Sequence, residues 1–300
     1  MFLDVVGPII VLLVIGFAAK EIGLLDSSRV DILNKLAFYV ALPALVFYST
    51  YSRSLKEIFS LPLVLAFCLV ILSTLIVGWF VHKRIEKNSR RSVATIQSYH
   101  GNIGYMGLPI VTMALEEAAG AKASLLLGVG SIIQILLTII ILIYLNTRQA
   151  EITKEITKGI INPVVLALVA GILFSYFGLS LPNLMEESIS ILSEAALPIA
   201  LLGVGASIEL ARRVGDLPII GSVIGLKMIL MPLLGWIAFS AFGVGGVAEE
   251  AGILMLGMPT AVSTFIYAKE LGGDARLASL NISLTTILSI LTISVMLLIF

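Results

Sequence analysis

The chain has 300 residues, of which 59% are hydrophobic and only 13% are charged, and its mean hydropathy is +1.09. Its 19 basic residues balance its 19 acidic residues, so the formal net charge is zero. These values exclude a soluble domain of this size and argue against nucleic acid as a partner. They indicate an all-α polytopic membrane protein.

Apolar segments long enough to cross a bilayer recur along the whole chain. The longest connection between them, residues 147–158, divides the chain into two halves, residues 1–146 and 159–300. We therefore predict ten membrane-spanning helices, five in each half, at residues 2–19, 32–50, 59–81, 92–116, 122–146, 159–178, 185–207, 217–242, 249–268 and 275–299.

Basic residues are distributed unequally between the two sides of this arrangement. The loops on one side hold only Arg53, Lys56 and Lys122. The loops on the other side hold fifteen of the 19 basic residues, namely Lys20, Arg29, Lys35, Lys83, Arg84, Lys87, Arg90, Arg91, Arg148, Lys154, Lys158, Arg212, Arg213, Lys269 and Arg276. Because loops rich in lysine and arginine face the cytoplasm, we expect a cell-membrane protein with both termini on the outer side.

The two halves share a pattern of glycine and proline. Four positions recur 155 residues later, and the pairs are Pro8 and Pro163, Gly16 and Gly171, Gly23 and Gly178, and Pro43 and Pro198. The word Gly107-x-Pro109 also returns as Gly257-x-Pro259. Because each half has an odd number of spans, the second half enters the membrane inverted, as in many transporters.

The fourth predicted span carries an unusual stretch, SYHGNIGYMGLPIVTM, from Ser98 to Met113. Proline removes a backbone donor and clashes with the preceding turn, so the helix is expected to break near Gly107-Leu108-Pro109. A second break is expected near Pro259. Interrupted helices in matching positions of two halves predict a binding site where the fourth and ninth helices cross near the membrane midplane. A proline-kinked helix that only packs closely on its neighbours is the alternative.

Helices that restart after Pro109 and Pro259 would present free N–H groups and the positive ends of their dipoles, which favour an anionic ligand. Asn102 could donate its amide to a carboxylate or hold the opposing broken segment. Thr260 and Ser263 offer hydroxyls, which could instead bond to their own helix. Tyr105 could stack on an organic substrate or serve packing alone.

Lys227 lies about ten residues into the eighth span, where a lysine costs at least ~2.5–3.5 kcal/mol on insertion scales. Three roles remain open: a fixed cation in a cavity, a proton carrier, or a counter-charge for the substrate. A structural ion pair with Glu194 is the alternative. The lone polar residues Gln134 and Asn281 are expected to form hydrogen bonds between helices.

The run from Asn102 to Pro109, read as N-x-x-x-x-G-x-P and including Gly107, resembles the signature of the auxin efflux carrier family. The run from Pro259 to Glu270, with Phe265-x-Tyr267-Ala-Lys-Glu, is similar to the ninth helix of that family. The family includes plant PIN transporters and bacterial carriers of malonate or malate. The long central loop of the plant members is missing here, so the resemblance does not extend to their regulation.

This resemblance implies a scaffold of helices 1, 2, 6 and 7, which would also form a homodimer, and a transport domain of helices 3–5 and 8–10 that moves like an elevator. It implies that the substrate binds beside the crossing helices.

The sequence thus predicts a secondary active transporter of small organic anions, with carboxylates such as dicarboxylates or auxin-like molecules as substrates. A sodium-coupled symporter similar to the bile acid family and a ligand sensor built on a transporter fold are the alternatives. The sequence shows no catalytic or nucleotide-binding motif, so we expect neither an enzyme nor a cofactor. The expected partners are the organic anion, the lipid bilayer and a second copy of the chain.

Overall fold

The computed structural model describes residues 2–51, 53–115, 117–146, 162–208 and 216–299. These residues form helices and no strand, and one isolated antiparallel bridge joins Gly101 to Thr260. The α-helices are α1 (Phe2–Glu21), α2 (Ser27–Leu36), α3 (Leu42–Tyr51), α4 (Leu55–Ile58), α5 (Leu61–Val81), α6 (Asn88–Gln97), α7 (Leu108–Ala114), α8 (Glu117–Asn146), α10 (Pro163–Phe177), α11 (Asn183–Glu194), α12 (Ala196–Ala206), α13 (Leu217–Ile224), α14 (Met231–Ala241), α15 (Val247–Leu256), α16 (Ser263–Glu270) and α17 (Ala275–Ile299).

Six helical stretches within the described residues are long and apolar enough to cross a membrane. They are Ser27–Tyr51, Leu61–Arg84, Ala118–Asn146, Asn183–Ala206, Leu217–Ala241 and Ala275–Ile299. Ile103–Ala114 and Pro163–Phe177 are shorter apolar helices. The prediction of a multi-pass, all-helical membrane protein is therefore confirmed, whereas the predicted connection at 147–158 lies outside the described residues.

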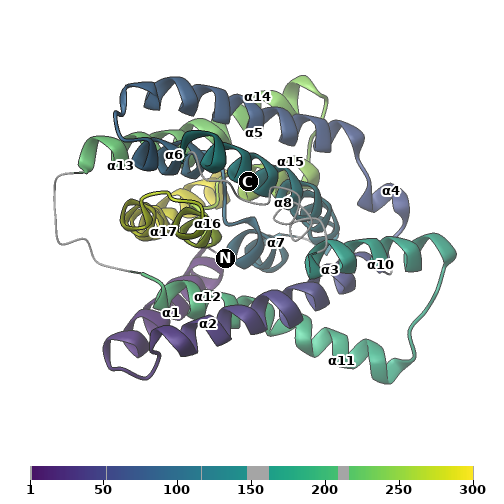
Figure 1. The fold of residues 1–300 in the computed structure, drawn as a ribbon. Coiled ribbons are helices and arrows are strands. Elements are labelled where there is room, and N and C mark those ends of the chain that lie inside the picture. The colour runs from purple at the N-terminus through teal and green to yellow at the C-terminus, as the bar shows by residue number, and fades with distance from the viewer. Residues whose placement is uncertain (1, 52, 116, 147–161, 209–215, 300) are drawn as a thin grey trace.

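The helices are arranged in two groups (Figure 1). In one group α3 packs against α10 and α11, and α12 packs against α1 and α2. In the other group α14 packs against α5 and α15. The long helix α8 contacts both groups, because it packs on α3 and α10 of the first and on α5 and α15 of the second.

Three prolines follow wide π-helical turns. The turns span Ala37–Ala41, Ile103–Gly107 and Gly225–Leu230, and each is followed directly by a helix whose second residue is Pro43, Pro109 or Pro232. A wide turn accommodates the proline ring and the carbonyl that lacks its usual donor. The chain therefore continues as a helix through these prolines.

The position of the first break corrects the prediction from sequence. The helix does not break near Gly107-Leu108-Pro109, because Gly107 has helical dihedral angles (φ −59°, ψ −64°) and Pro109 lies in the first turn of α7. The interruption lies earlier, at residues 98–102, between α6 and the π-helical turn. The second break, residues 257–262, does contain Pro259 as predicted.

Two glycines allow α1 and α12 to approach closely. A Cβ atom built on Gly205 would lie 2.2 Å from the carbonyl oxygen of Leu13, and one built on Gly16 would lie 2.2 Å from that of Leu202. Both obstacles are backbone atoms, so the helices would have to move apart to accept any side chain. Small residues at such contacts are typical of helix pairs in membranes.

We expect Gly205→Ala to destabilise the protein by about 1–3 kcal/mol, the usual cost of overpacking a tight contact. Gly221→Ala in α13 is the matched control, since a Cβ there meets no described residue within 4 Å. The control measures the gain in helix propensity that replacing glycine by alanine brings without a steric clash. In detergent, Gly205→Ala should therefore melt at a lower temperature than Gly221→Ala. Equal melting temperatures would contradict the close α1–α12 contact.

Candidate functional site

The two breaks meet and pair through their backbones. The N–H of Asn102 donates to the carbonyl oxygen of Pro259 over 2.7 Å, and the N–H of Ala261 donates to that of His100 over 3.0 Å. Gly101 and Thr260 form the bridge between these two bonds. Unwound backbone at membrane depth must find partners inside the protein, and here each break supplies them to the other.

Buried side chains fix the second break to its neighbours. The Thr260 hydroxyl donates to the carbonyl oxygen of Gln97 over 3.0 Å, and the Thr260 N–H donates to Oγ1 of Thr285 over 3.2 Å. The Gln97 amide donates to Oγ1 of Thr264 over 2.9 Å and accepts from Nδ2 of Asn281 over 2.7 Å. The helix-to-helix bond predicted for Asn281 is therefore confirmed, and all five residues are buried.

The first break contacts α8 on its other side. Nδ1 of His100 lies 2.8 Å from Oγ1 of Thr138, and the Tyr99 hydroxyl lies 3.0 Å from the same oxygen. One turn away on α8, Gln134 is buried, and neither its Nε2 nor its Oε1 has a hydrogen-bond partner within the described residues. The hydrogen bond between helices that the sequence suggested for Gln134 is therefore not formed.

Asn102 is buried and has spare hydrogen-bonding capacity. Its backbone N–H bonds to the opposing segment, but the side-chain amide, for which the sequence predicted a role, does not: Nδ2 has no partner in the part of the chain that the structure describes. Buried polar groups are normally satisfied, so an open donor points to a ligand or water. Asn102 and Gln134 therefore have open donors near the crossover, and Oδ1 of Asn281 is an open acceptor there.

Lys227 also lies at the crossover. It is fully buried on the π-helical turn Gly225–Leu230, and its ammonium donates to the carbonyl oxygen of Leu256 over 2.6 Å. A Cβ atom on Gly101 would be 3.1 Å from Nζ of Lys227. The alternative of an ion pair with Glu194 is wrong, since Glu194 is exposed and no such pair occurs among the described residues.

The other predicted site residues are spread around the crossover. The hydroxyl of half-buried Tyr105 donates to the carbonyl oxygen of Asn34 over 3.3 Å, so Tyr105 packs towards α2. Gly107 is close to α15, because a Cβ there would lie 2.7 Å from Sδ of Met255. Ser263 begins α16 and is half-buried.

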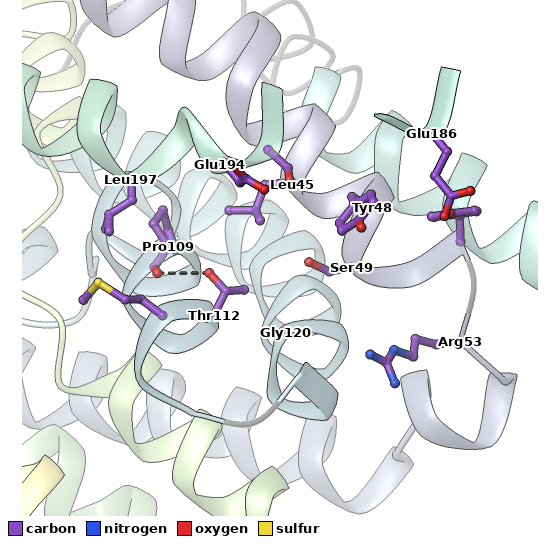
Figure 2. Close-up of a pocket in the computed structure, with 13 residues that line it drawn as sticks. Leu45, Tyr48, Ser49, Arg53, Pro109, Thr112, Gly120, Glu186, Glu194 and Leu197 are labelled. Atoms are coloured by element: carbon purple, nitrogen blue, oxygen red, sulfur yellow. Dashed lines mark hydrogen bonds between the residues drawn. The ribbon is translucent and has the colours of Figure 1, made fainter. Parts of the chain in front are cut away.

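A cavity of about 430 Å³ opens where α3, α7, α8, α11 and α12 meet (Figure 2). Pro109 is the one predicted site residue that lines it, and the Thr112 hydroxyl beside it bonds to the Pro109 carbonyl over 3.0 Å. Charged and polar side chains at its wall include Ser49, Arg53, Glu186 and Glu194. The cavity thus lies between α3, α11 and α12 of the first helix group and the helices α7 and α8.

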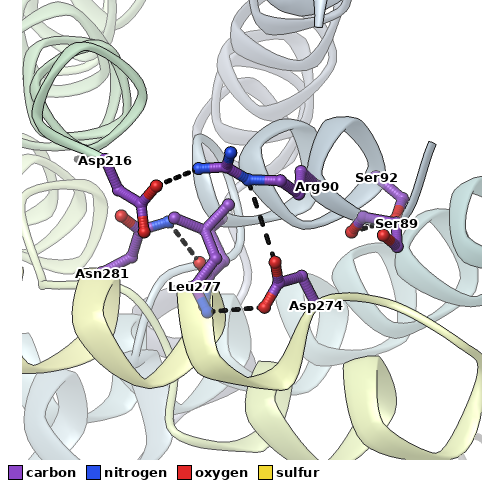
Figure 3. A network of polar contacts seen from close by, with 8 residues as sticks. Ser89, Arg90, Ser92, Asp216, Asp274, Leu277 and Asn281 are labelled. Atoms are coloured by element: carbon purple, nitrogen blue, oxygen red, sulfur yellow. Dashed lines mark hydrogen bonds and ion pairs between the residues drawn. The ribbon is translucent and has the colours of Figure 1, made fainter. Parts of the chain in front are cut away.

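A cluster of ion pairs connects the N-terminal ends of α6, α13 and α17 (Figure 3). Arg90 in α6 pairs with Asp216, which precedes α13, and its Nε lies 3.8 Å from Oδ2 of Asp274, which precedes α17. Asp274 also caps α17 by accepting from the N–H of Leu277 over 3.0 Å. These residues are partly exposed, so the cluster orients the helices more than it stabilises them.

Comparison with known proteins finds similarity to transporters along nearly the whole chain. A family model described as a membrane transport protein matches residues 1–297. A Rhizobium meliloti protein named "Putative malonate transporter" is 25% identical over 300 residues, covering 96% of this chain and 92% of its own. Uncharacterized transporters of Methanocaldococcus jannaschii and Methanothermobacter thermautotrophicus are each 24% identical, covering 97% of this chain and 96% and 95% of their own.

We expect Thr260→Val to cost about 1–3 kcal/mol, because it keeps the side-chain volume but leaves the buried Gln97 carbonyl without its donor. Thr74→Val is the matched control: Thr74 is equally buried, but among the described residues its hydroxyl bonds only to Val70 of its own helix. Thermal unfolding should show the larger loss for Thr260→Val. An equal loss in both variants would contradict the role of Thr260 in joining the breaks.

Proposed function

This chain belongs to the membrane transport protein family, and we propose that it is a secondary active carrier of small organic anions that works by alternating access at the helix crossover. The resemblance to auxin efflux carriers noted from the sequence is confirmed by the family match. The matched family and the named relatives are transporters, not enzymes.

The pairing of the two breaks is the observation that carries the proposal. It places the open amide of Asn102, the hydroxyl of Thr260 and the ammonium of Lys227 on three segments that meet in the protein interior. A buried amide donor and a cation both favour a carboxylate guest. We propose Asn102, Tyr105, Gly107, Pro109, Pro259, Thr260 and Ser263 as the residues around the substrate, and Lys227 as the residue of charge compensation or coupling.

We propose ten membrane helices in two inverted repeats, residues 1–146 and 159–300. The helices outside the six long stretches would be α1, α6 with α7, α10, and α15 with α16. Helices α1–α3 and α10–α12 would form the scaffold, and the rest would form the transport domain. The cavity beside Pro109 supports this division, because α3, α11 and α12 of the proposed scaffold line it on one side and α7 and α8 of the proposed transport domain on the other.

The substrate class is proposed from the site and from one relative. The Rhizobium meliloti protein is named for malonate, which is a small dicarboxylate. A sodium-coupled symporter remains the second candidate, and a ligand sensor the third. Uptake into proteoliposomes distinguishes a sensor, which would bind the anion without moving it.

We expect malonate or a related carboxylate to raise the melting temperature of the purified protein, because a ligand that binds the native state stabilises it. Asn102→Ala should weaken this binding at least about tenfold, the loss of one charge-assisted hydrogen bond. Exposed Asn183→Ala is the control and should bind normally. If mono- and dicarboxylates all leave the melting temperature unchanged, the proposed substrate class is wrong.

We also propose a cell-membrane location with both termini outside, and cysteine labelling tests the orientation. In a Cys68→Ala background, a cysteine at Asn88, which begins α6, should be shielded from an impermeant external thiol reagent. A cysteine at Asn183, which begins α11, should be labelled in intact cells. External labelling at position 88 would mean that the orientation is opposite to the one proposed. Both cysteines should react in permeabilised cells, which controls for their reactivity.

A further inference from the structure

The ammonium group of Lys227 occupies a position where the two breaks come together. We propose that it is a built-in cation that holds the crossover closed, takes the place of a coupling sodium ion at the end of α15, and makes transport independent of sodium. The statement about coupling rests on the proposed function, whereas the statement about the crossover concerns the protein without substrate.

The first contact of the ammonium is with the end of a helix. Leu256 is the last residue of α15, so its carbonyl oxygen is one of the four that have no partner within the helix. Lys227 donates to this oxygen over 2.6 Å. The carbonyl ends of a helix carry partial negative charge and attract cations, and full burial removes the screening by water.

The second contact is with the first break. A Cβ atom on Gly101 would lie 3.1 Å from both Cε and Nζ of Lys227. The absence of a side chain at Gly101 therefore leaves the space that the ammonium fills. Lys227 therefore contacts Leu256, which precedes the second break, and Gly101, which lies in the first break. Its charge acts on both breaks.

Sodium ions in transporters are held by the carbonyl oxygens of unwound helices and helix ends. At this crossover such an oxygen, that of Leu256, already has a cation against it. Among the described residues no carboxylate pairs with Lys227, so a second cation beside it would meet uncompensated repulsion. A tethered ammonium provides the same attraction without being bound and released in each cycle.

Chemical rescue tests the built-in cation. Lys227→Ala should lower the melting temperature of the purified, substrate-free protein and reduce carboxylate uptake at least about tenfold, as expected when a buried hydrogen bond to a charged group is lost. Methylammonium should raise both values in this variant, since it restores an ammonium to the space that the side chain left. The control is Lys227→Met, which fills that space without charge and should not respond to methylammonium.

The outcomes separate this proposal from the proposed function. The built-in cation would be wrong if methylammonium left the melting temperature of Lys227→Ala unchanged. It would also be wrong if methylammonium raised the melting temperature of Lys227→Met by the same amount. Wild-type uptake that falls at least tenfold when choline replaces sodium would overturn it as well. If no carboxylate is transported, the proposed function is wrong. The effect of methylammonium on the melting temperature of substrate-free Lys227→Ala still decides whether Lys227 stabilises the crossover.

A second variant covers the case in which Lys227→Ala cannot be purified. Gly101→Ala keeps the lysine but places a methyl group against its ammonium. It should lower the melting temperature of the substrate-free protein relative to Gly221→Ala, whose Cβ meets nothing. Equal melting temperatures would contradict the contact between Lys227 and the first break.

Discussion

The need to satisfy backbone groups inside the membrane controls the centre of this protein. A broken helix exposes N–H and C=O groups that lipid cannot satisfy, so one break alone would be costly. Here residues 100–102 and 259–261 pair with each other across an isolated bridge. The two breaks are therefore interdependent. This dependence explains why segments more than 150 residues apart in the chain meet in the interior.

The two breaks are built differently, although the sequence words around them match. Pro259 lies within its break, whereas Pro109 lies in the first turn of α7, after a π-helical turn that absorbs the ring. Pro43 and Pro232 follow wide turns in the same way. A proline in a membrane helix therefore marks a place where the backbone pattern changes, and its surroundings decide between a break and a wide turn.

The properties that depend on composition and length could be predicted from the sequence. Those that depend on tertiary contacts could not. Hydropathy was enough for a multi-pass helical protein, and the depth of Lys227 within its span was enough to single it out. The exact position of the first break, the exposure of Glu194 and the central role of Gln97 depend on which helices meet. Gln97 could have been noticed as an amide that directly precedes the polar stretch from Ser98 to Asn102.

Some polar groups at the crossover are bonded to one another, and others keep open hydrogen-bonding capacity. The first kind holds the crossover together, and the second kind is available to a ligand. Gln97, Thr260, Asn281 and Thr285 bond to one another and join the second break to α17, with only Oδ1 of Asn281 left without a partner among the described residues. Buried hydrogen-bond networks of this kind hold their members in fixed positions. Asn102, which lies in the first break, and Gln134, which lies on α8, keep open hydrogen-bonding capacity. Because α8 also contacts both groups of the fold, a ligand bound to the open amide of Gln134 would touch the helix that joins them.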